Sequence, residues 1–237
     1  TGGTTGKPKG VLWRQADIYF AALGGRKPDG REVESIDEVV ARAKRGGLNY
    51  MPTAPFMHAA HWVAFDALLG GNTVVIQDET RRLDAASILR TAERERVDVI
   101  LIVGDAFARP LLEELARQRY DLSALRVVGS GGAVLDARTK EALLEALPEG
   151  VKIIDTVGSS ETGTQASHAT TRGKAGGAGH FRANPGAAVL SADRSHLLAP
   201  GDDEIGWFAH FVERMDYTYT QRATKGYRFA DGALPDL

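Results

Sequence analysis

The chain has 237 residues, of which 29 are basic and 31 acidic, and its formal net charge is −2. Such a near-neutral balance argues against nucleic acid as the main partner, because neutralising phosphates needs a clustered basic excess. Cysteine is absent, which excludes disulfides, thiolate nucleophiles and cysteine-bound metals. No apolar run approaches the roughly 18 residues of a membrane span, so we expect no such span and a cytoplasmic location.

Helices and strands alternate along most of the chain. Ser35-Ile-Asp-Glu38 has the pattern of a capping box and predicts a helix that stops at Gly46. Spacing and apolar runs then predict, in chain order, a helix over 58–69, a strand over 73–77, a helix over 84–96 capped by Asp84, a strand over 98–103, a helix over 107–119 with Pro110 in its first turn, a strand over 125–128, a helix over 136–147, a strand over 151–154, a flexible glycine-rich loop over 172–179, and strands over 187–190 and 204–208.

Alternating strands and helices of this length imply an α/β fold with a doubly wound, mainly parallel sheet. In such sheets ligands sit beyond the carboxyl ends of the strands. Two unusual loops are expected there, Ser130-Gly-Gly-Ala133 after the third strand and Gly158-Ser-Ser-Glu-Thr-Gly163 after the fourth.

The first ten residues read Thr-Gly-Gly-Thr-Thr-Gly-Lys-Pro-Lys-Gly. Glycines let backbone N–H groups approach an anion, threonines add hydroxyl donors, and lysine offsets charge, so this composition is typical of a phosphate-binding loop. A flexible Gly/Thr linker is the alternative. A Walker loop does not fit, because Gly2 and Gly6 enclose three residues and Pro8 follows Lys7.

Two other familiar motifs also fail on spacing. After Gly129-Ser-Gly131, Val134 stands where a Rossmann fingerprint needs its third glycine. After Gly158-Ser-Ser160, Thr162 stands where a nucleophile elbow needs glycine, which disfavours a serine hydrolase built on Ser159 or Ser160.

The decapeptide resembles the phosphate loop of the adenylate-forming enzymes, the superfamily of acyl-CoA synthetases, luciferases and peptide-synthetase adenylation domains, at every position. Gly158–Gly163 resembles the second family signature, Gly131-Gly-Ala133 the small-residue turn against adenine, and Pro55-Phe-Met-His58 the aromatic/histidine motif near the acyl pocket. The sequences around Trp13, Phe107 and Ser159 are most similar to those of actinobacterial acyl-CoA synthetases that act on fatty or steroid-derived carboxylates.

This resemblance implies a reaction in which a carboxylate and ATP give acyl-AMP and pyrophosphate, after which the thiolate of CoA attacks the acyl carbon. A small-molecule carboxylate is the implied substrate, with ATP, Mg²⁺ and CoA as cofactors and co-substrate. The implied nucleotide-binding residues are Thr1, Gly2, Gly3, Thr4, Thr5, Gly6, Lys9, Gly131, Gly132, Ala133, Val157, Gly158 and Ser159. Lys9 would offset phosphate charge, Thr162 would bond a phosphate oxygen, and Glu161 would bind Mg²⁺, which prefers carboxylate oxygen.

The implied acyl pocket contains His58, Trp62 and Phe107, although the last two fit a core role equally well. His58 and His61 have zinc-ligand spacing, but no third ligand is near in sequence. Asp66 invites comparison with the aspartate that pairs a substrate ammonium in amino-acid adenylation, yet its spacing from the helix end disfavours that interpretation.

The resemblance covers residues 1–207, a partial AMP-binding domain, whereas 208–237 depart from the family and stay unassigned. Tyr227-Arg-Phe-Ala-Asp231 is a poor match to the family's ribose-binding motif. We therefore expect a truncated chain that needs N- and C-terminal regions of the same enzyme and that is weakly active or inactive alone. A non-catalytic nucleotide-binding remnant is the main alternative.

Overall fold

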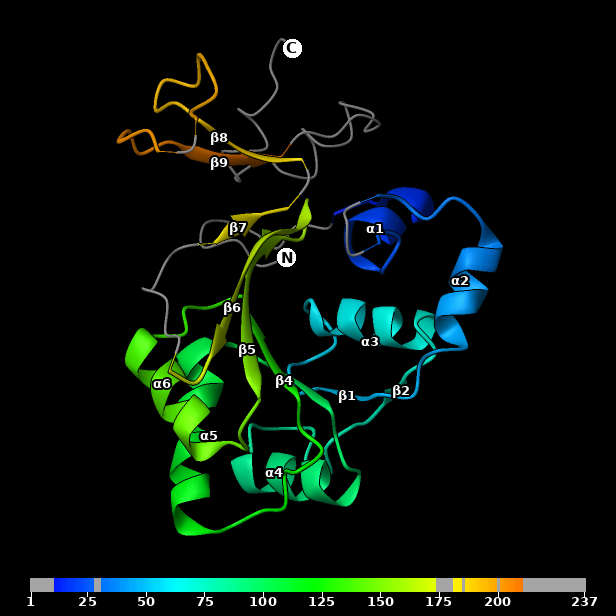
Figure 1. Ribbon diagram of the computed structural model, residues 1–237, viewed down its shortest axis with the longest axis vertical. Coiled ribbons are helices and arrows are strands. Elements are labelled where there is room, and N and C mark those ends of the chain that lie inside the picture. Colours follow the sequence, from blue (N-terminus) through cyan, green and yellow to red (C-terminus); the bar gives the residue numbers. More distant parts are fainter. Residues whose placement is uncertain (1–10, 28–30, 174–180, 185, 200, 211–237) are drawn as a thin grey trace.

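The computed structural model describes residues 11–27, 31–173, 181–184, 186–199 and 201–210. The described elements, in chain order (Figure 1), are α1 (Gln15–Ala22), α2 (Ile36–Ala43), β1 (Asn49–Pro52), α3 (Ala60–Leu69), β2 (Thr73–Val74), α4 (Ala85–Arg94), β3 (Val99–Ile102), α5 (Gly104–Arg117), β4 (Val127–Gly131), α6 (Ala137–Ala146), β5 (Lys152–Ser159), β6 (Gly163–Thr171), β7 (Arg182–Ala183), β8 (Ala187–Leu190) and β9 (Trp207–His210). Within those ranges, no helix is long and apolar enough to cross a membrane.

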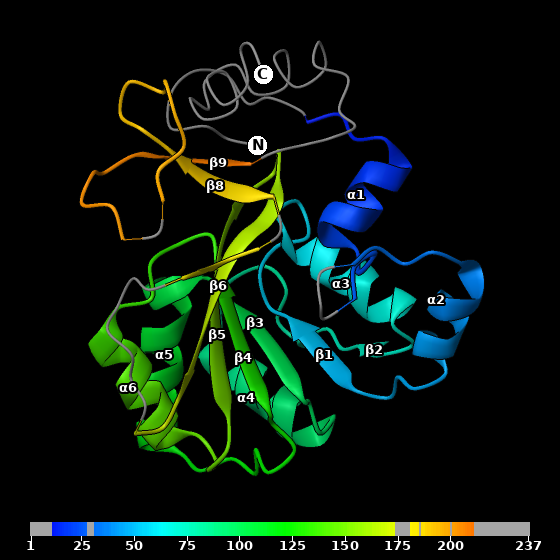
Figure 2. The ribbon, with the colours of Figure 1, turned by 45° about the horizontal axis from the view of Figure 1, so that its top comes forward.

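Seven strands form one sheet in the order β2-β1-β3-β4-β5-β6-β7 (Figure 2). The five strands from β2 to β5 run parallel, and β6 and β7 are antiparallel additions at one edge. Strands β8 and β9 pair separately as an antiparallel hairpin. The α/β fold with a mainly parallel sheet, predicted from the alternation of elements, is confirmed.

Helices α4, α5 and α6 enclose the main apolar core against one face of the sheet. Its buried members alternate along the strands, as Ile100 and Ile102 do on β3, and include Ile88 and Leu89 of α4 and Leu143 of α6. Helix α3 instead packs on β1 and β2, and α1 lies beside β6. Helices α1 to α3 thus gather away from α5 and α6 (Figures 1 and 2).

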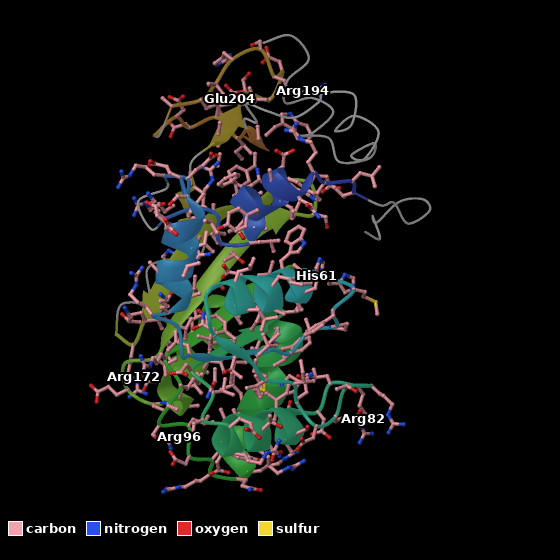
Figure 3. All side chains as sticks on the ribbon, turned by 90° about the vertical axis from the view of Figure 1, so that its right-hand side faces the viewer. His61, Arg82, Arg96, Arg172, Arg194 and Glu204 are labelled. Carbon is pink, nitrogen blue, oxygen red and sulfur yellow. The ribbon has the colours of Figure 1, made fainter. Side chains whose placement is uncertain are left out.

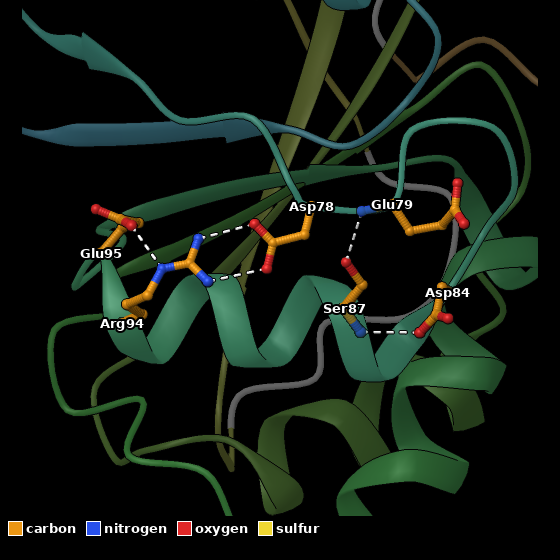
Figure 4. Close-up of polar contacts among 6 residues, drawn as sticks. All are labelled: Asp78, Glu79, Asp84, Ser87, Arg94 and Glu95. Atoms are coloured by element: carbon orange, nitrogen blue, oxygen red, sulfur yellow. Dashed lines mark hydrogen bonds and ion pairs between the residues drawn. The ribbon is translucent and has the colours of Figure 1, made fainter.

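Helix α4 begins where the sequence predicts it. The Asp84 carboxylate accepts a hydrogen bond from the Ser87 N–H at 2.8 Å, which satisfies one of the free donors of the first turn. The Ser87 hydroxyl accepts in turn from the N–H of Glu79 at 2.9 Å. At the other end of the helix, Arg94 forms a bidentate ion pair with Asp78, with both N–O distances at 2.9 Å (Figure 4). Both ends of α4 are therefore tied to the chain that follows β2.

The predicted cap of α2 is partly confirmed. Ser35 accepts from the N–H of Glu38 at 3.4 Å. The Glu38 carboxylate, however, accepts from the N–H of Glu34 at 3.0 Å, one residue earlier than a capping box requires.

Two predicted boundaries are wrong in ways that affect the site. Helix α5 begins at Gly104, not at 107; Gly104 has a φ of +50°, and its N–H donates to the Ser130 hydroxyl at 3.2 Å. Pro110 therefore lies inside the helix, beyond its first turn, and Phe107 lies within α5 rather than at a loop-to-helix junction. Strand β5 extends to Ser159, so that Val157 to Ser159 belong to a strand rather than to a loop.

Other boundaries shift less. Strand β2 is shorter than predicted and β9 begins later, while α3 starts two residues after 58. Helix α1 and strands β1, β6 and β7 were not predicted at all. Most of the glycine-rich segment 172–179 and all of 211–237 lie outside the described residues.

Candidate functional site

The predicted second signature forms the tip of the β5–β6 hairpin. Ser159 pairs with Gly163 across the hairpin, and Ser160 to Thr162 make the turn. The Ser159 hydroxyl accepts from the N–H of Glu161 at 3.2 Å and lies 3.0 Å from the Thr162 hydroxyl. The polar side chains that the sequence singled out thus form a hydrogen-bonded turn at the end of an antiparallel pair.

Glycine is required below this turn. The pairing register shifts between Val157 and Gly158, and a Cβ at Gly158 would lie 2.1 Å from the Gly163 carbonyl oxygen. No side chain fits at that distance. Gly158 therefore lets the two strands approach each other closely at the base of the turn.

Glu161 is the unusual residue of the turn. Its side chain is only 2% exposed, and neither carboxylate oxygen has a hydrogen-bond partner among the described residues. Buried polar groups are normally satisfied, and each exception needs an explanation. A carboxylate with free oxygens is the donor set that a hard divalent cation prefers, so the residue fits the Mg²⁺ ligand role that the sequence predicts for it.

The chain that follows the decapeptide contacts this turn. The indole Nε1 of Trp13 donates to the Ser160 carbonyl at 2.8 Å. At the other end of the turn, Gly163 has a φ of +71°, and a Cβ there would lie 2.6 Å from the Ala21 carbonyl oxygen of α1. The decapeptide itself, with Thr1 to Gly6 and Lys9, lies outside the described residues.

The predicted adenine-side turn lies at the neighbouring strand end. Gly131 ends β4 and pairs with Thr156 of β5, one residue before Val157. A Cβ at Gly131 would lie 2.6 Å from the Thr156 hydroxyl, which donates to the Ser130 carbonyl at 3.1 Å. Gly132 continues the chain with a φ of +79° into Ala133, and both are exposed, as is Val157. The structure thus brings this turn and Val157 to the same edge of the sheet.

The predicted acyl-pocket residues are separated into two groups. His58 is exposed in the turn before α3, its carbonyl lies 2.5 Å from Nδ1 of His61, and the His61 and Trp62 rings meet edge to face at 5.7 Å. His61 lies at the start of α3 (Figure 3). Phe107 instead packs against the apolar core between the sheet and α4 to α6. This packing favours the core alternative for Phe107, whereas the pocket role of all three residues stays a prediction.

Neither the zinc-site interpretation of His58 and His61 nor the amino-acid-adenylation interpretation of Asp66 gains support. Among the residues that the structure describes, no three His, Asp or Glu side chains cluster as metal ligands, so His58 and His61 have no third partner there. Asp66 points toward the α1–α2 connection, because its carboxylate lies against Gly24, whose carbonyl accepts from Arg42. Burial raises the pKa of the Asp66 carboxyl, and the charge of Arg42 only partly opposes that.

Sequence reasoning missed a buried ion pair that anchors β5. Lys140 of α6 pairs with Asp155, and both side chains are buried. The pattern Val151-x-Ile153-x-Asp155 places the aspartate on the same face as two core residues, which is the signal that could have indicated a buried partner. The pair fixes the helix-facing side of β5 six residues before Glu161.

The hydroxyls of the turn do not match a hydrolase. Ser159 ends a strand that continues through a hairpin into β6, whereas a nucleophile elbow needs a strand-to-helix turn. This topology contradicts the structural context that a serine nucleophile at Ser159 or Ser160 would need.

The fold agrees with comparisons with known proteins. The family model for AMP-binding enzymes matches residues 1–206, and the chain belongs to this family. It is 47% identical over 212 residues to the medium-chain acyl-CoA ligase Mig of Mycobacterium avium, covering 88% of this chain and 38% of that protein. It is 39% identical over 244 residues to a medium/long-chain-fatty-acid/3-oxocholest-4-en-26-oate–CoA ligase of Mycobacterium marinum, covering 97% and 43%.

Among solved structures, the chain is similar to the N-terminal subdomain of NpsA from Klebsiella oxytoca in complex with 3-hydroxyanthranilyl-AMSN. The TM-score is 0.60 at 19% identity, over 85% of this chain and 48% of that one. This likeness supports the fold alone. The chain spans about two fifths of the length of the two ligases.

Proposed function

We propose that this chain is the nucleotide-binding part of an AMP-forming acyl-CoA synthetase, which activates a carboxylate with ATP through an acyl-AMP and passes the acyl group to CoA. The observation that carries the proposal is the hairpin tip, where Glu161 is buried, its two carboxylate oxygens have no partner in the part of the chain that the structure describes, and the chain just after the phosphate-loop motif contacts the same turn. Trp13, three residues after the first family signature, contacts Ser160 of the second signature, 147 positions further along the chain.

The described residues and the decapeptide have separable roles in this proposal. The backbone N–H groups and hydroxyls of Thr1 to Gly6 hold the phosphates, and Lys9 offsets their charge. Glu161 holds Mg²⁺, which when bound neutralises triphosphate charge, and Thr162 donates its hydroxyl to a phosphate oxygen. Catalysis in phosphoryl-centred steps rests on positioning and charge stabilisation, so no nucleophilic side chain is needed.

The exposed backbone of Gly132 and Ala133, next to Gly131, is where we place the adenine ring. A side chain at position 131 would collide with Thr156, so glycine is needed there. The exposed Val157 and the backbone of Gly158 lie on the next strand. Valine supplies apolar contact there without the stacking that an aromatic residue would add.

A fatty or steroid-like carboxylate is the substrate class we propose. The proposal draws on the two ligases, whose names specify medium- or long-chain acyl groups and a steroid acid. The exposed apolar side chains before and along α3, Phe56, Met57 and Phe65, suit such a ligand. His58 and Trp62 would line the same pocket.

Full turnover requires polypeptide that corresponds to the parts of the ligases outside the match. The proposal is that residues 1–207 form part of an AMP-binding domain, and that the remaining contacts to the transition state come from those parts. Each such contact is worth roughly 3 kcal/mol, so their loss would leave this chain weakly active or able only to bind nucleotide.

Hydroxylamine trapping tests the proposal. The chain is incubated with ATP, Mg²⁺, hydroxylamine and either a medium-chain fatty acid or a steroid carboxylate, and hydroxamate is quantified. We expect product that Glu161→Ala abolishes and that Glu149→Ala, a change of an exposed loop glutamate, leaves unchanged. ATP binding without hydroxamate would instead identify a nucleotide-binding remnant, and ATP-independent ester cleavage would identify a hydrolase.

A further inference from the structure

We propose that Trp13 is a positioning residue that holds the peptide group before Glu161, and thereby orients the Glu161 carboxylate. This inference rests on the function proposed above and adds a residue that no family signature includes. It follows from one long-range hydrogen bond and the geometry around it.

The peptide group between Ser160 and Glu161 is held from both sides. Its carbonyl accepts from the indole Nε1 of Trp13 at 2.8 Å, and its N–H donates to the Ser159 hydroxyl at 3.2 Å. Because a peptide group is planar, fixing both its oxygen and its N–H fixes the plane from which the Glu161 side chain departs. A carboxylate that has no hydrogen bond of its own among the described residues is thus oriented through its backbone.

Trp13 also lies at the right place in the chain. It follows the decapeptide by three residues, and three residues span at most about 11 Å of extended chain. Helix α1 then continues to the other end of the turn, where Ala21 meets Gly163. One N-terminal segment therefore contacts both ends of the Glu161 turn, and Figure 1 shows α1 beside the end of the β5–β6 pair.

Packing alone does not account for Trp13. The side chain is only partly buried and does not belong to the apolar core that α4 to α6 enclose. The chain offers a matched control in Trp207, which is also partly buried and whose Nε1 donates to the Ala192 carbonyl at 2.9 Å in the β8–β9 hairpin. The two tryptophans make the same kind of bond, but only Trp13 holds the Glu161 turn.

The test measures ATP affinity of Trp13→Phe, Trp207→Phe and Glu161→Gln by calorimetry, once with Mg²⁺ and once with EDTA. We expect Trp13→Phe to weaken binding about fivefold with Mg²⁺, the effect of one hydrogen bond, and to leave binding in EDTA unchanged. Trp207→Phe should match the wild type in both. In the Glu161→Gln background Trp13→Phe should cause no further loss, because Trp13 acts through Glu161.

Equal losses with and without Mg²⁺, or a loss that adds to that of Glu161→Gln, would assign Trp13 a general structural role and overturn the inference. Suppose that Mg²⁺ strengthens ATP binding by the wild type but not by Glu161→Gln, while Trp13→Phe behaves like Trp207→Phe. The inference then fails and the proposed function survives. If the wild type does not bind ATP, the proposed function fails as well.

A measurement on the unsubstituted protein covers the case in which Trp13→Phe does not fold. In ¹⁵N-labelled protein, with indole signals assigned through backbone connectivities, Mg²⁺ added to the ATP-bound state should shift the indole N–H signal of Trp13. The signal of Trp207 should stay in place. An unshifted Trp13 signal would overturn the inference.

Discussion

Replacing Glu161 by methionine should stabilise the protein in the absence of nucleotide while removing its response to Mg²⁺ and ATP. The Glu161 side chain is 2% exposed, and both of its oxygens lack a partner within the described ranges. Methionine has a similar length and no atom that needs a hydrogen bond. The variant therefore removes an unsatisfied buried group without opening a large cavity.

The expected gain follows from the cost of leaving a buried polar group unpaired, about 1–3 kcal/mol and more for a charged one. For a chain of this size each 1 kcal/mol shifts the melting temperature by about 2–4 °C. The wild type should recover this deficit on binding, because a ligand at a hundred times its Kd stabilises a protein by about 2.7 kcal/mol. Glu161→Met should show no such recovery beyond what ATP without Mg²⁺ provides.

Urea unfolding followed by circular dichroism, with and without ATP and Mg²⁺, measures both effects. Asp155→Asn is the matched control, because Asp155 is also a buried acid but pairs with the buried Lys140. Breaking a buried pair from one side costs about 3–5 kcal/mol, so this variant should unfold at lower urea. A lower midpoint for Glu161→Met, or an undiminished Mg²⁺-dependent shift, would refute the reasoning.

Three further predictions concern the scaffold. Gly163→Ala should lower stability by about 2 kcal/mol or more in urea unfolding, because its Cβ would meet the Ala21 carbonyl, whereas Gly173→Ala, at the same φ of +71° but in open space, should cost less. Asp84→Ala should cost about 1 kcal/mol through the lost cap of α4, seen as a lower thermal midpoint. Burial raises the pKa of the Asp66 carboxyl. Its contribution to the free energy of unfolding is therefore full below the ordinary pKa and is lost as the pH rises through the raised pKa of the folded state. Asp66→Asn should flatten this fall of stability when unfolding is measured from pH 3 to 7.

The parallel core could be predicted because its strands carry unmistakable apolar runs. Residues 98–103 and 151–154 each follow a helix that an aspartate caps, Asp84 for α4 and Asp136 for α6, and the structure has β3 and β5 there. Strand β6 was missed because its sequence, from Gly163 to Thr171, is mostly polar. Gln165 and Thr170 are buried in it, and the Gln165 amide donates to the Ala209 carbonyl at 3.3 Å. A partner 44 positions away gives no periodic signal.

The candidate site could likewise be predicted from the sequence only in part. Glu161, Thr162 and Gly131 could be singled out, because short motifs of unusual composition follow predicted strands. Trp13 could not, since its relevance depends on a contact with Ser160, 147 positions away, that only the folded chain creates. The extent of β5 was misjudged for a related reason, because Gly158 breaks the strand pattern locally yet is required where the two strands approach.

The main apolar core includes no residue between Thr156 and Gly163. What holds the fold together and what would contact the nucleotide are thus largely different sets of side chains. Substituting Glu161 or Thr162 would therefore leave that core intact, so that a loss of activity in such variants would report on the candidate site rather than on unfolding.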